Sequence, residues 1–160
     1  MSNLEIDDKR ILAEFGELTS KDQYKSYKKS IKKSANIIVR AARRRLKQRI
    51  GPAINHKNRW NGRTLASGIR ASIGRDKVTA SVHIMGDFRL KFFELGTSER
   101  YTKASGRKYS RGRRGKGSYR GKMKPLYFFR SAVKSKESEV ESSFFTSLEA
   151  SIEKIKEKYR

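Results

Sequence analysis

The chain has 160 residues, and its 40 Lys and Arg outnumber its 16 Asp and Glu to give a formal net charge of +24. This length predicts a single domain over residues 1–160, and the absence of Cys excludes disulfides, thiol catalysis and cysteine-held metal clusters. No stretch is apolar enough for a transmembrane helix, and the N-terminus lacks the apolar segment of a secretory signal. We therefore expect a polyanionic partner, of which nucleic acid is the commonest, and no membrane association.

Two helices are predicted in the first third of the chain. Residues 4–18 form a short helix whose apolar side carries Ile11, Leu12 and Phe15. A much longer helix over residues 24–50 begins after a Thr19-Ser20 cap and stops at Gly51-Pro52. Its apolar stripe follows spacings of three or four through Tyr24, Tyr27, Ile31, Ala35, Ile38, Ala42, Leu46 and Ile50. The rest of its surface is strongly basic, and Arg43-Arg44-Arg45 spans too much of a turn to face one partner.

The middle of the chain predicts a small sheet. Residues 51–68 are expected to form loop and turn, and Leu65, Ile69 and Ile73 fit either a helical turn or an irregular strand. Residues 77–86 alternate apolar and polar side chains, which indicates a half-buried strand. After a turn at Gly86-Asp87, the alternation in residues 88–95 predicts a second strand that completes an antiparallel hairpin.

Residues 103–124 are predicted to be a long basic arm inserted in the fold. They contain ten basic residues, five Gly and no acidic residue, with little that can be buried. Such an arm can neutralise nucleic-acid phosphates without reading sequence, and Tyr109 and Tyr119 can stack on unpaired bases. An acidic protein surface is the alternative partner. The candidate nucleic-acid-binding residues are Arg107, Lys108, Arg111, Arg113, Arg114, Lys116 and Arg120.

The C-terminal part returns to an apolar pattern. Residues 124–133 form a strand or turn that leads into a final helix, on which Val140, Phe144, Leu148 and further apolar residues make a stripe. The fold class is α+β: long N-terminal and C-terminal amphipathic helices packed on a small antiparallel β-sheet, with the basic loop inserted.

The sequence predicts no catalytic site, no metal and no cofactor. It has neither a Gly-x-Ser-x-Gly elbow nor a phosphate-binding Gly-x-x-x-x-Gly-Lys loop. The acidic residues of the central region are scattered, whereas a magnesium-dependent nuclease needs clustered carboxylates. His56 and His83 are interpreted as a loop residue and an outward-facing strand residue.

Several motifs together resemble the neck or tail-completion proteins of tailed bacteriophages, a head–tail connector family often called minor tail proteins. The resemblance covers residues 20–150 and is carried by Arg63-Thr64-Leu65, by Ile69 to Ile73, by Phe92-Phe93-Glu94-Leu95-Gly96-Thr97 and by Lys124-Pro125-Leu126-Tyr127-Phe128-Phe129-Arg130-Ser131-Ala132-Val133. The chain departs from the family pattern in the position of Gly62 before Arg63 and in the length and charge of its loop.

The resemblance implies a virion structural protein, found in the neck or tail of the particle and in the host cytoplasm during assembly. Six or twelve copies would form a homo-oligomeric ring that joins the portal or adaptor to the tail-tube or tail-terminator proteins and bounds the DNA channel. The residues that match the family's motifs are expected to be structural: Glu94, Gly96, Thr97, Pro125, Phe128 and Ala132.

Two other functions are considered from the residues alone. A ribosomal-type or other RNA-binding protein fits the size, the charge and the Gly/Arg-rich arm, although no recognised RNA-binding motif accompanies them. A nuclease would require Glu94 as a metal ligand and would lose Mg²⁺-dependent cleavage in Glu94→Ala.

Overall fold

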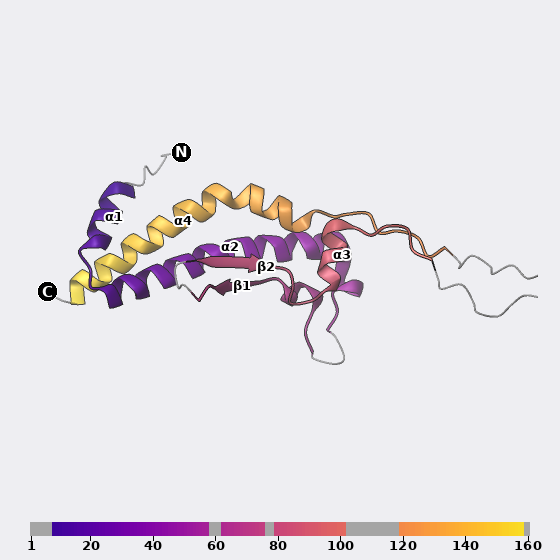
Figure 1. Ribbon diagram of the computed structural model, residues 1–160, viewed down its shortest axis with the longest axis horizontal. Helices are drawn as coiled ribbons and strands as arrows, with labels where there is room; N and C mark the ends of the chain where they lie inside the picture. Colours follow the sequence, from indigo (N-terminus) through magenta and orange to yellow (C-terminus); the bar gives the residue numbers. More distant parts are fainter. Residues whose placement is uncertain (1–7, 58–61, 76–78, 102–118, 159–160) are drawn as a thin grey trace, which may run out of the picture.

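Two long helices form the frame of the protein, and a small sheet lies along one of them. The computed structural model describes residues 8–57, 62–75, 79–101 and 119–158. These residues form the helices α1 (Asp8–Gly16), α2 (Ser20–Ile54), α3 (Arg89–Leu95) and α4 (Phe128–Lys158) and the strands β1 (Arg70–Ile73) and β2 (Ala80–His83). α4 runs antiparallel to α2 (Figure 1). The predicted α+β class with a small antiparallel sheet is confirmed for the described residues, in which helix dominates.

α2 begins next to its predicted cap and is interrupted at the predicted Gly51-Pro52 stop. The Thr19 hydroxyl accepts the backbone N–H of Asp22 at 3.4 Å, which caps the first turn. At the other end Gly51 adopts φ 68° and ψ 176°, a conformation that interrupts the helix before Pro52. One further helical turn follows and ends at Ile54. The predicted end at Gly51-Pro52 is therefore the position of a break, with a short helical extension beyond it.

α2 meets α4 partly through serines rather than through its apolar stripe alone. Ser26, Ser30 and Ser34 are buried on α2, as are Ser147 and Ser151 on α4. Their small side chains let the two helices approach closely. The hydroxyls of Ser30, Ser34 and Ser151 donate to the carbonyl one turn earlier in their own helix, as Ser30 does to Ser26 at 2.9 Å, and so stay satisfied when buried. The Ser26 hydroxyl is buried and has no hydrogen-bond partner among the described residues.

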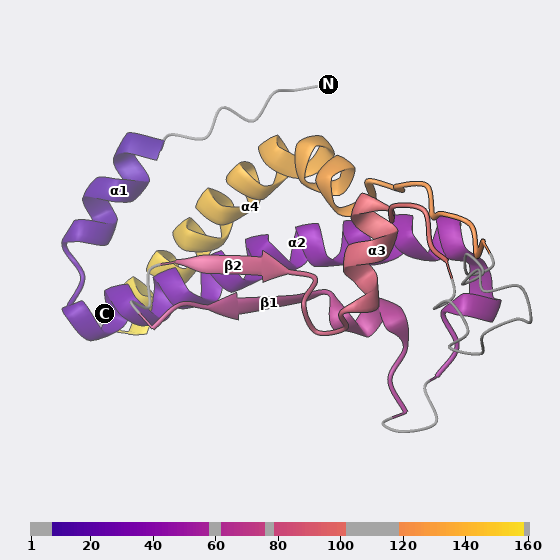
Figure 2. The same cartoon turned by 45° about the vertical axis from the view of Figure 1, so that its right-hand side comes forward.

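The sheet pairs β1 with β2 in antiparallel register, with Arg70 opposite His83 and Ile73 opposite Ala80. β2 lies within the strand predicted for residues 77–86, of which residues 77 and 78 fall outside the described part. The segment left open between helical turn and strand contains both, because a 3₁₀ turn at Leu65–Gly68 precedes β1. Figure 2 shows the two strands beside α2, with α3 crossing near the end of β2.

The prediction that residues 88–95 form the second strand of a hairpin is wrong, because this segment is helix α3. Asp87, in the turn predicted at Gly86-Asp87, accepts the backbone N–H of Arg89 at 3.0 Å and so supports the start of the helix. Leu90 and Glu94, four positions apart, are the buried residues of α3. In so short a segment an alternating pattern and a helical pattern coincide.

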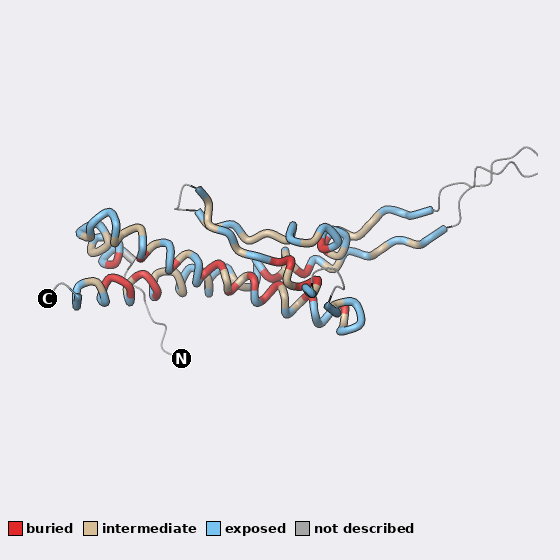
Figure 3. Tube along the Cα trace, turned by 90° about the horizontal axis from the view of Figure 1, so that it is seen from below, coloured by how far each residue is buried: buried red, intermediate tan, exposed pale blue. Residues whose placement is uncertain are grey.

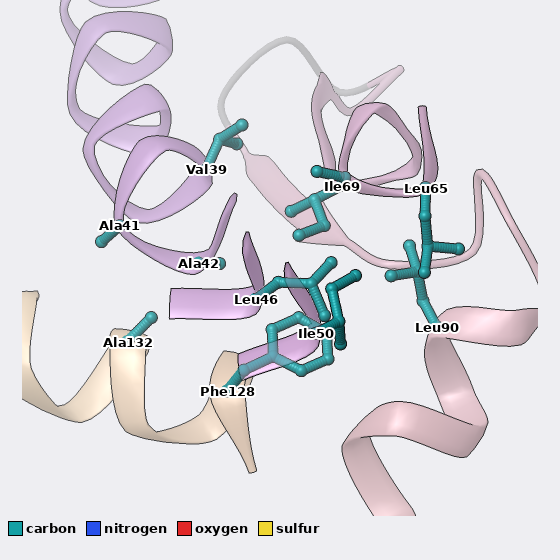
Figure 4. Packing of buried hydrophobic residues seen from close by; sticks show 11 residues of the cluster. Val39, Ala41, Ala42, Leu46, Ile50, Leu65, Ile69, Leu90, Phe128 and Ala132 are labelled. Atoms are coloured by element: carbon teal, nitrogen blue, oxygen red, sulfur yellow. The ribbon is translucent and has the colours of Figure 1, made fainter. Parts of the chain in front are cut away.

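The core is divided into two clusters. The larger one joins α2 to the 3₁₀ turn, the sheet, α3 and the start of α4 (Figure 4). Its buried side chains include Val39, Ala42, Leu46, Ile50, Leu65, Ile69, Leu90, Phe128 and Ala132. The smaller cluster holds α1 against the C-terminal half of α4 through Ile11, Leu148 and Ile152. Ion pairs between Arg10 and Glu149 and between Lys156 and Glu14 accompany this second contact.

Candidate functional site

The Glu94 side chain binds the N-terminus of α4. One carboxylate oxygen accepts the backbone N–H of Phe129 at 2.8 Å, and the other accepts that of Arg130 at 3.0 Å. Only 6% of Glu94 is exposed. A negative charge here satisfies two N–H groups that the helix cannot pair internally and interacts favourably with the positive end of the helix dipole. α3 therefore positions the carboxylate that fixes where α4 begins.

The residues that follow Glu94 extend this junction along the chain. Thr97 and Met123 exchange two hydrogen bonds of 3.0 Å, one through the Thr97 hydroxyl. Gly96 immediately precedes Thr97 and has φ 74°, and a Cβ at this position would stand 2.6 Å from the Met123 carbonyl oxygen and 3.0 Å from Pro125. Only glycine fits both the backbone conformation and the space. Phe128 and Ala132 continue from the junction into the larger core cluster.

Beyond the junction, residues 97–101 and 119–123 leave the body as an antiparallel ribbon (Figure 1). The Arg120 N–H donates to the Arg100 carbonyl at 2.7 Å. Tyr101 pairs with Tyr119, with ring centroids 5.4 Å apart, and more than half of each residue is exposed. Figure 3 shows that this ribbon carries no buried residue along its outer part.

Of the predicted nucleic-acid-binding residues, the structure places only Arg120, an exposed residue of the ribbon. The other six lie outside the described residues: Arg107, Lys108, Arg111, Arg113, Arg114 and Lys116. Tyr109 lies outside them as well, and Tyr119 already packs against Tyr101. The long basic loop therefore remains a prediction. What the structure adds is its base, a ribbon whose exposed residues include Arg100, Arg120 and Lys122.

α3 presents apolar side chains to solvent on the face opposite its buried one. Phe88 is 69% exposed, Phe92 is 42% exposed and Leu95 is 59% exposed, and Met85 just before the helix is 66% exposed. Phe88 and Phe92 pack edge to face, one turn apart. We call these four residues the α3 ridge. A surface patch of this kind commonly marks a contact with another molecule.

A second apolar surface is a groove between α2, α4 and β2, with a volume of about 540 Å³. Its lining is mainly apolar and includes Tyr27, Ile31, Ile38, Val82, Val133, Val140 and Phe144. Four of the eight residues of the stripe predicted for α2 line this groove, and three of them, Tyr27, Ile31 and Ile38, are only half-buried. The groove and the α3 ridge share no residue.

The three consecutive arginines of α2 point to three different surroundings, as their angular spread predicts. Arg43 donates to the Ile69 carbonyl at 2.7 Å and so ties α2 to the sheet. Arg45 donates to the Ser131 and Ser135 hydroxyls of α4. Arg44 between them is exposed. The basic residues of α2 therefore divide into those that hold the fold together and those that face solvent.

No metal-binding cluster and no membrane-spanning helix occur in the described part of the chain. No three His, Asp or Glu side chains there stand close enough to hold an ion. His56 lies just after α2 and His83 in β2. Among the described residues, no helix combines the length and apolar character needed to cross a bilayer.

Comparisons of the chain with models of protein families, with curated proteins and with solved structures find no match.

Proposed function

We propose that this chain is a structural subunit of a ring in the neck of a tailed bacteriophage, where it joins the DNA-filled head to the tail. The proposal rests first on the motifs shared with the neck and tail-completion proteins. Its partners are further copies of itself, a portal or adaptor above and tail-tube or tail-terminator proteins below. In such a ring the basic arm faces the DNA in the channel. The assembled protein is a component of the virion.

The observation that carries the proposal is that one chain exposes two different apolar surfaces. The α3 ridge is a patch of exposed side chains built around Phe88 and Phe92, whereas the surface between α2, α4 and β2 is an apolar groove. Contact between unlike surfaces of identical subunits is heterologous, and such contacts generate a closed ring when the rotation between neighbours closes. Identical patches facing each other would instead give a two-fold dimer.

The geometry of Glu94 favours this structural function over a nuclease. Both oxygens of its carboxylate accept backbone N–H groups of α4, and the residue is buried. A magnesium ligand would need those oxygens for the ion and would need a second carboxylate nearby. The motif around Glu94 therefore acts on the position of α4.

Charge sets the conditions under which the ring forms. Each copy brings a net charge of +24, so neighbouring copies repel one another at low ionic strength. Salt screens this repulsion, because the Debye length falls from about 30 Å at 0.01 M to about 10 Å at 0.1 M. We expect assembly to strengthen as salt is added, which is the opposite of the salt response of nucleic-acid binding.

The test is the mass of the purified protein by light scattering over a series of salt concentrations. Wild type is expected to shift from monomer to a single closed oligomer as salt rises. The variant Phe88→Ser/Phe92→Ser should remain monomeric, whereas the control Leu12→Ser/Ile54→Ser, which changes exposed apolar residues elsewhere, should assemble like wild type. A wild-type protein that stays monomeric at every salt concentration contradicts the ring, and tight RNA binding by that monomer would favour the RNA-binding alternative.

A further inference from the structure

α2 carries a row of exposed basic residues that runs along the edge where α2 meets α4. Lys29, Lys33, Arg40, Arg44 and Lys47 are all exposed. They follow one another at spacings of four, seven, four and three, which places them on one side of the helix. At a rise of 1.5 Å per residue the row is about 27 Å long. We call it the α2 row.

The α2 row is unpaired, unlike the other arginines of the same helix. Arg43 and Arg45 bond to the sheet and to α4. Within the described part of the chain, none of the five row residues makes an ion pair or a side-chain hydrogen bond. The α2 sequence explains the excess, since residues 20–54 contain twelve basic residues and only Asp22 as an acid. Clustered cations without partners are costly unless a polyanion binds them.

Two hollows between α2 and α4 lie along the α2 row and are themselves mainly basic. One, of about 340 Å³, is lined by Arg40, Arg44 and Lys136, with Glu139 as its acidic residue. The other, of about 240 Å³, is lined by Lys25, Lys29, Lys154 and Lys158, with Asp22 as its acid. Lys136 already pairs with Glu139, so this acid is partly neutralised before it meets Arg40 or Arg44.

The spacing and composition of the α2 row fit a nucleic-acid backbone better than a protein surface. Duplex DNA carries one negative charge per about 1.7 Å of axis, so about eight phosphates of each strand lie within the length of the row. An acidic protein partner would normally be anchored by buried aromatic or aliphatic groups as well. The row offers none, because the residues next to its cations on this side of the helix are polar, such as Asn36, or buried, such as Ile37.

We propose that the α2 row is a nucleic-acid-binding surface on the body of the protein, separate from the arm, which binds backbone phosphates without reading sequence. It belongs to a different element from the ribbon that leads into the arm. The surface is present in a single copy of the chain, so it does not depend on assembly into a ring. Phosphate contacts of this kind position a duplex or a single strand and leave the bases unread.

The test measures binding of a labelled mixed-sequence DNA duplex and of a single-stranded RNA of the same length by fluorescence anisotropy at several salt concentrations. The row variant carries K29Q, K33Q, R40Q, R44Q and K47Q. The matched control carries K9Q, K57Q, R75Q, K91Q and K134Q, which remove the same charge from exposed positions off the row. A third variant changes the six arm residues outside the described part to Gln, so that arm and row are separated.

Loss of five phosphate contacts lowers the salt slope for duplex DNA by about 4.5. Between about 50 and about 200 mM salt, wild type should then lose up to about 500-fold more affinity than the row variant. The control should keep a slope within about 1 of wild type, and the arm variant should still bind. Loss on one probe alone identifies that nucleic acid as the ligand. Equal behaviour of the row variant and the control, or no binding by the arm variant, would overturn the proposal.

Discussion

Replacing Glu94 tests whether this carboxylate holds the start of α4. It is buried, and its oxygens accept the N–H groups of Phe129 and Arg130 at 2.8 and 3.0 Å. Glu94→Ala leaves both partly buried donors without their acceptor, next to the buried Phe128. Glu94→Gln keeps one carbonyl acceptor but turns an N–H₂ group toward a backbone N–H and removes the charge.

The expected loss of unfolding free energy in Glu94→Ala has three contributions, which partly overlap. Hydrogen bonds to a charged group are each worth about 1.5–3 kcal/mol, and loss of a helix N-cap costs about 0.5–2 kcal/mol. A charge at a partly buried helix end adds up to about 2 kcal/mol. Because these values describe the same contacts in part, we expect Glu94→Ala to lower the free energy of unfolding by about 3–4 kcal/mol. Glu94→Gln should lower it by about 2 kcal/mol.

The assay is urea unfolding followed by circular dichroism, with Glu94→Gln as the variant that is most certain to fold. Glu137→Ala is the matched control, because Glu137 is an exposed glutamate on α4 itself. The control should stay within about 0.5 kcal/mol of wild type. A Glu94→Ala protein as stable as the control would refute the assigned role of Glu94 and reopen a role for this carboxylate in chemistry.

Three further predictions concern folding. Gly96→Ala should lower the free energy of unfolding by about 3 kcal/mol, since the φ of Gly96 is 74° and a Cβ there would lie 2.6 Å from the Met123 carbonyl oxygen. The control is Gly16→Ala, because a Cβ at Gly16 would have no atom within 4 Å, and this change should have no measurable cost in the same urea titration. Ser30→Leu should cost about 2–3 kcal/mol by overpacking the contact between α2 and α4, whereas Ser30→Ala should cost less than about 1.5 kcal/mol, as read from thermal melts. The hydrogen bond from the Arg89 side chain lowers the pKa of Asp87 below its usual 3.8. The ionised Asp87 carboxylate therefore stabilises the folded protein above pH 3.8, and this stabilisation is lost as the pH falls through the lower pKa of the folded state. The difference in free energy of unfolding between wild type and Asp87→Asn should close in acid. A difference that does not change with pH would contradict this prediction.

The long elements could be predicted because several independent signals agree in each of them. In α2, sustained periodicity, the Thr19 cap and Gly51-Pro52 all indicate one helix, and the structure has it. The alternation in residues 77–86 also marks a real strand, which the structure has at Ala80–His83. In α3 the signal is too short, since Leu90 and Glu94 fit either a helix or an alternating strand until the start of α4 is placed beside them.

The contacts that could not be predicted join residues far apart in the chain. Glu94 bonds to Phe129, 35 positions later, and no local pattern indicates that pairing. The buried serines between α2 and α4 could not be found as part of an apolar stripe, because serine is polar. Two closely packed helices require small side chains at their contact, whether polar or apolar. The groove could not be predicted because its apolar residues look like core residues in the sequence. Residues such as Ile31 and Ile38 have the periodicity of core residues, yet no element of the described chain covers them.

The most direct test of the proposed neck function is the copy number of this protein in purified phage particles, measured by quantitative mass spectrometry against the major capsid protein. A structural ring predicts a fixed number, six or twelve copies, in every DNA-filled particle. Absence from particles, or association of single copies with ribosomes or other RNA, would contradict it.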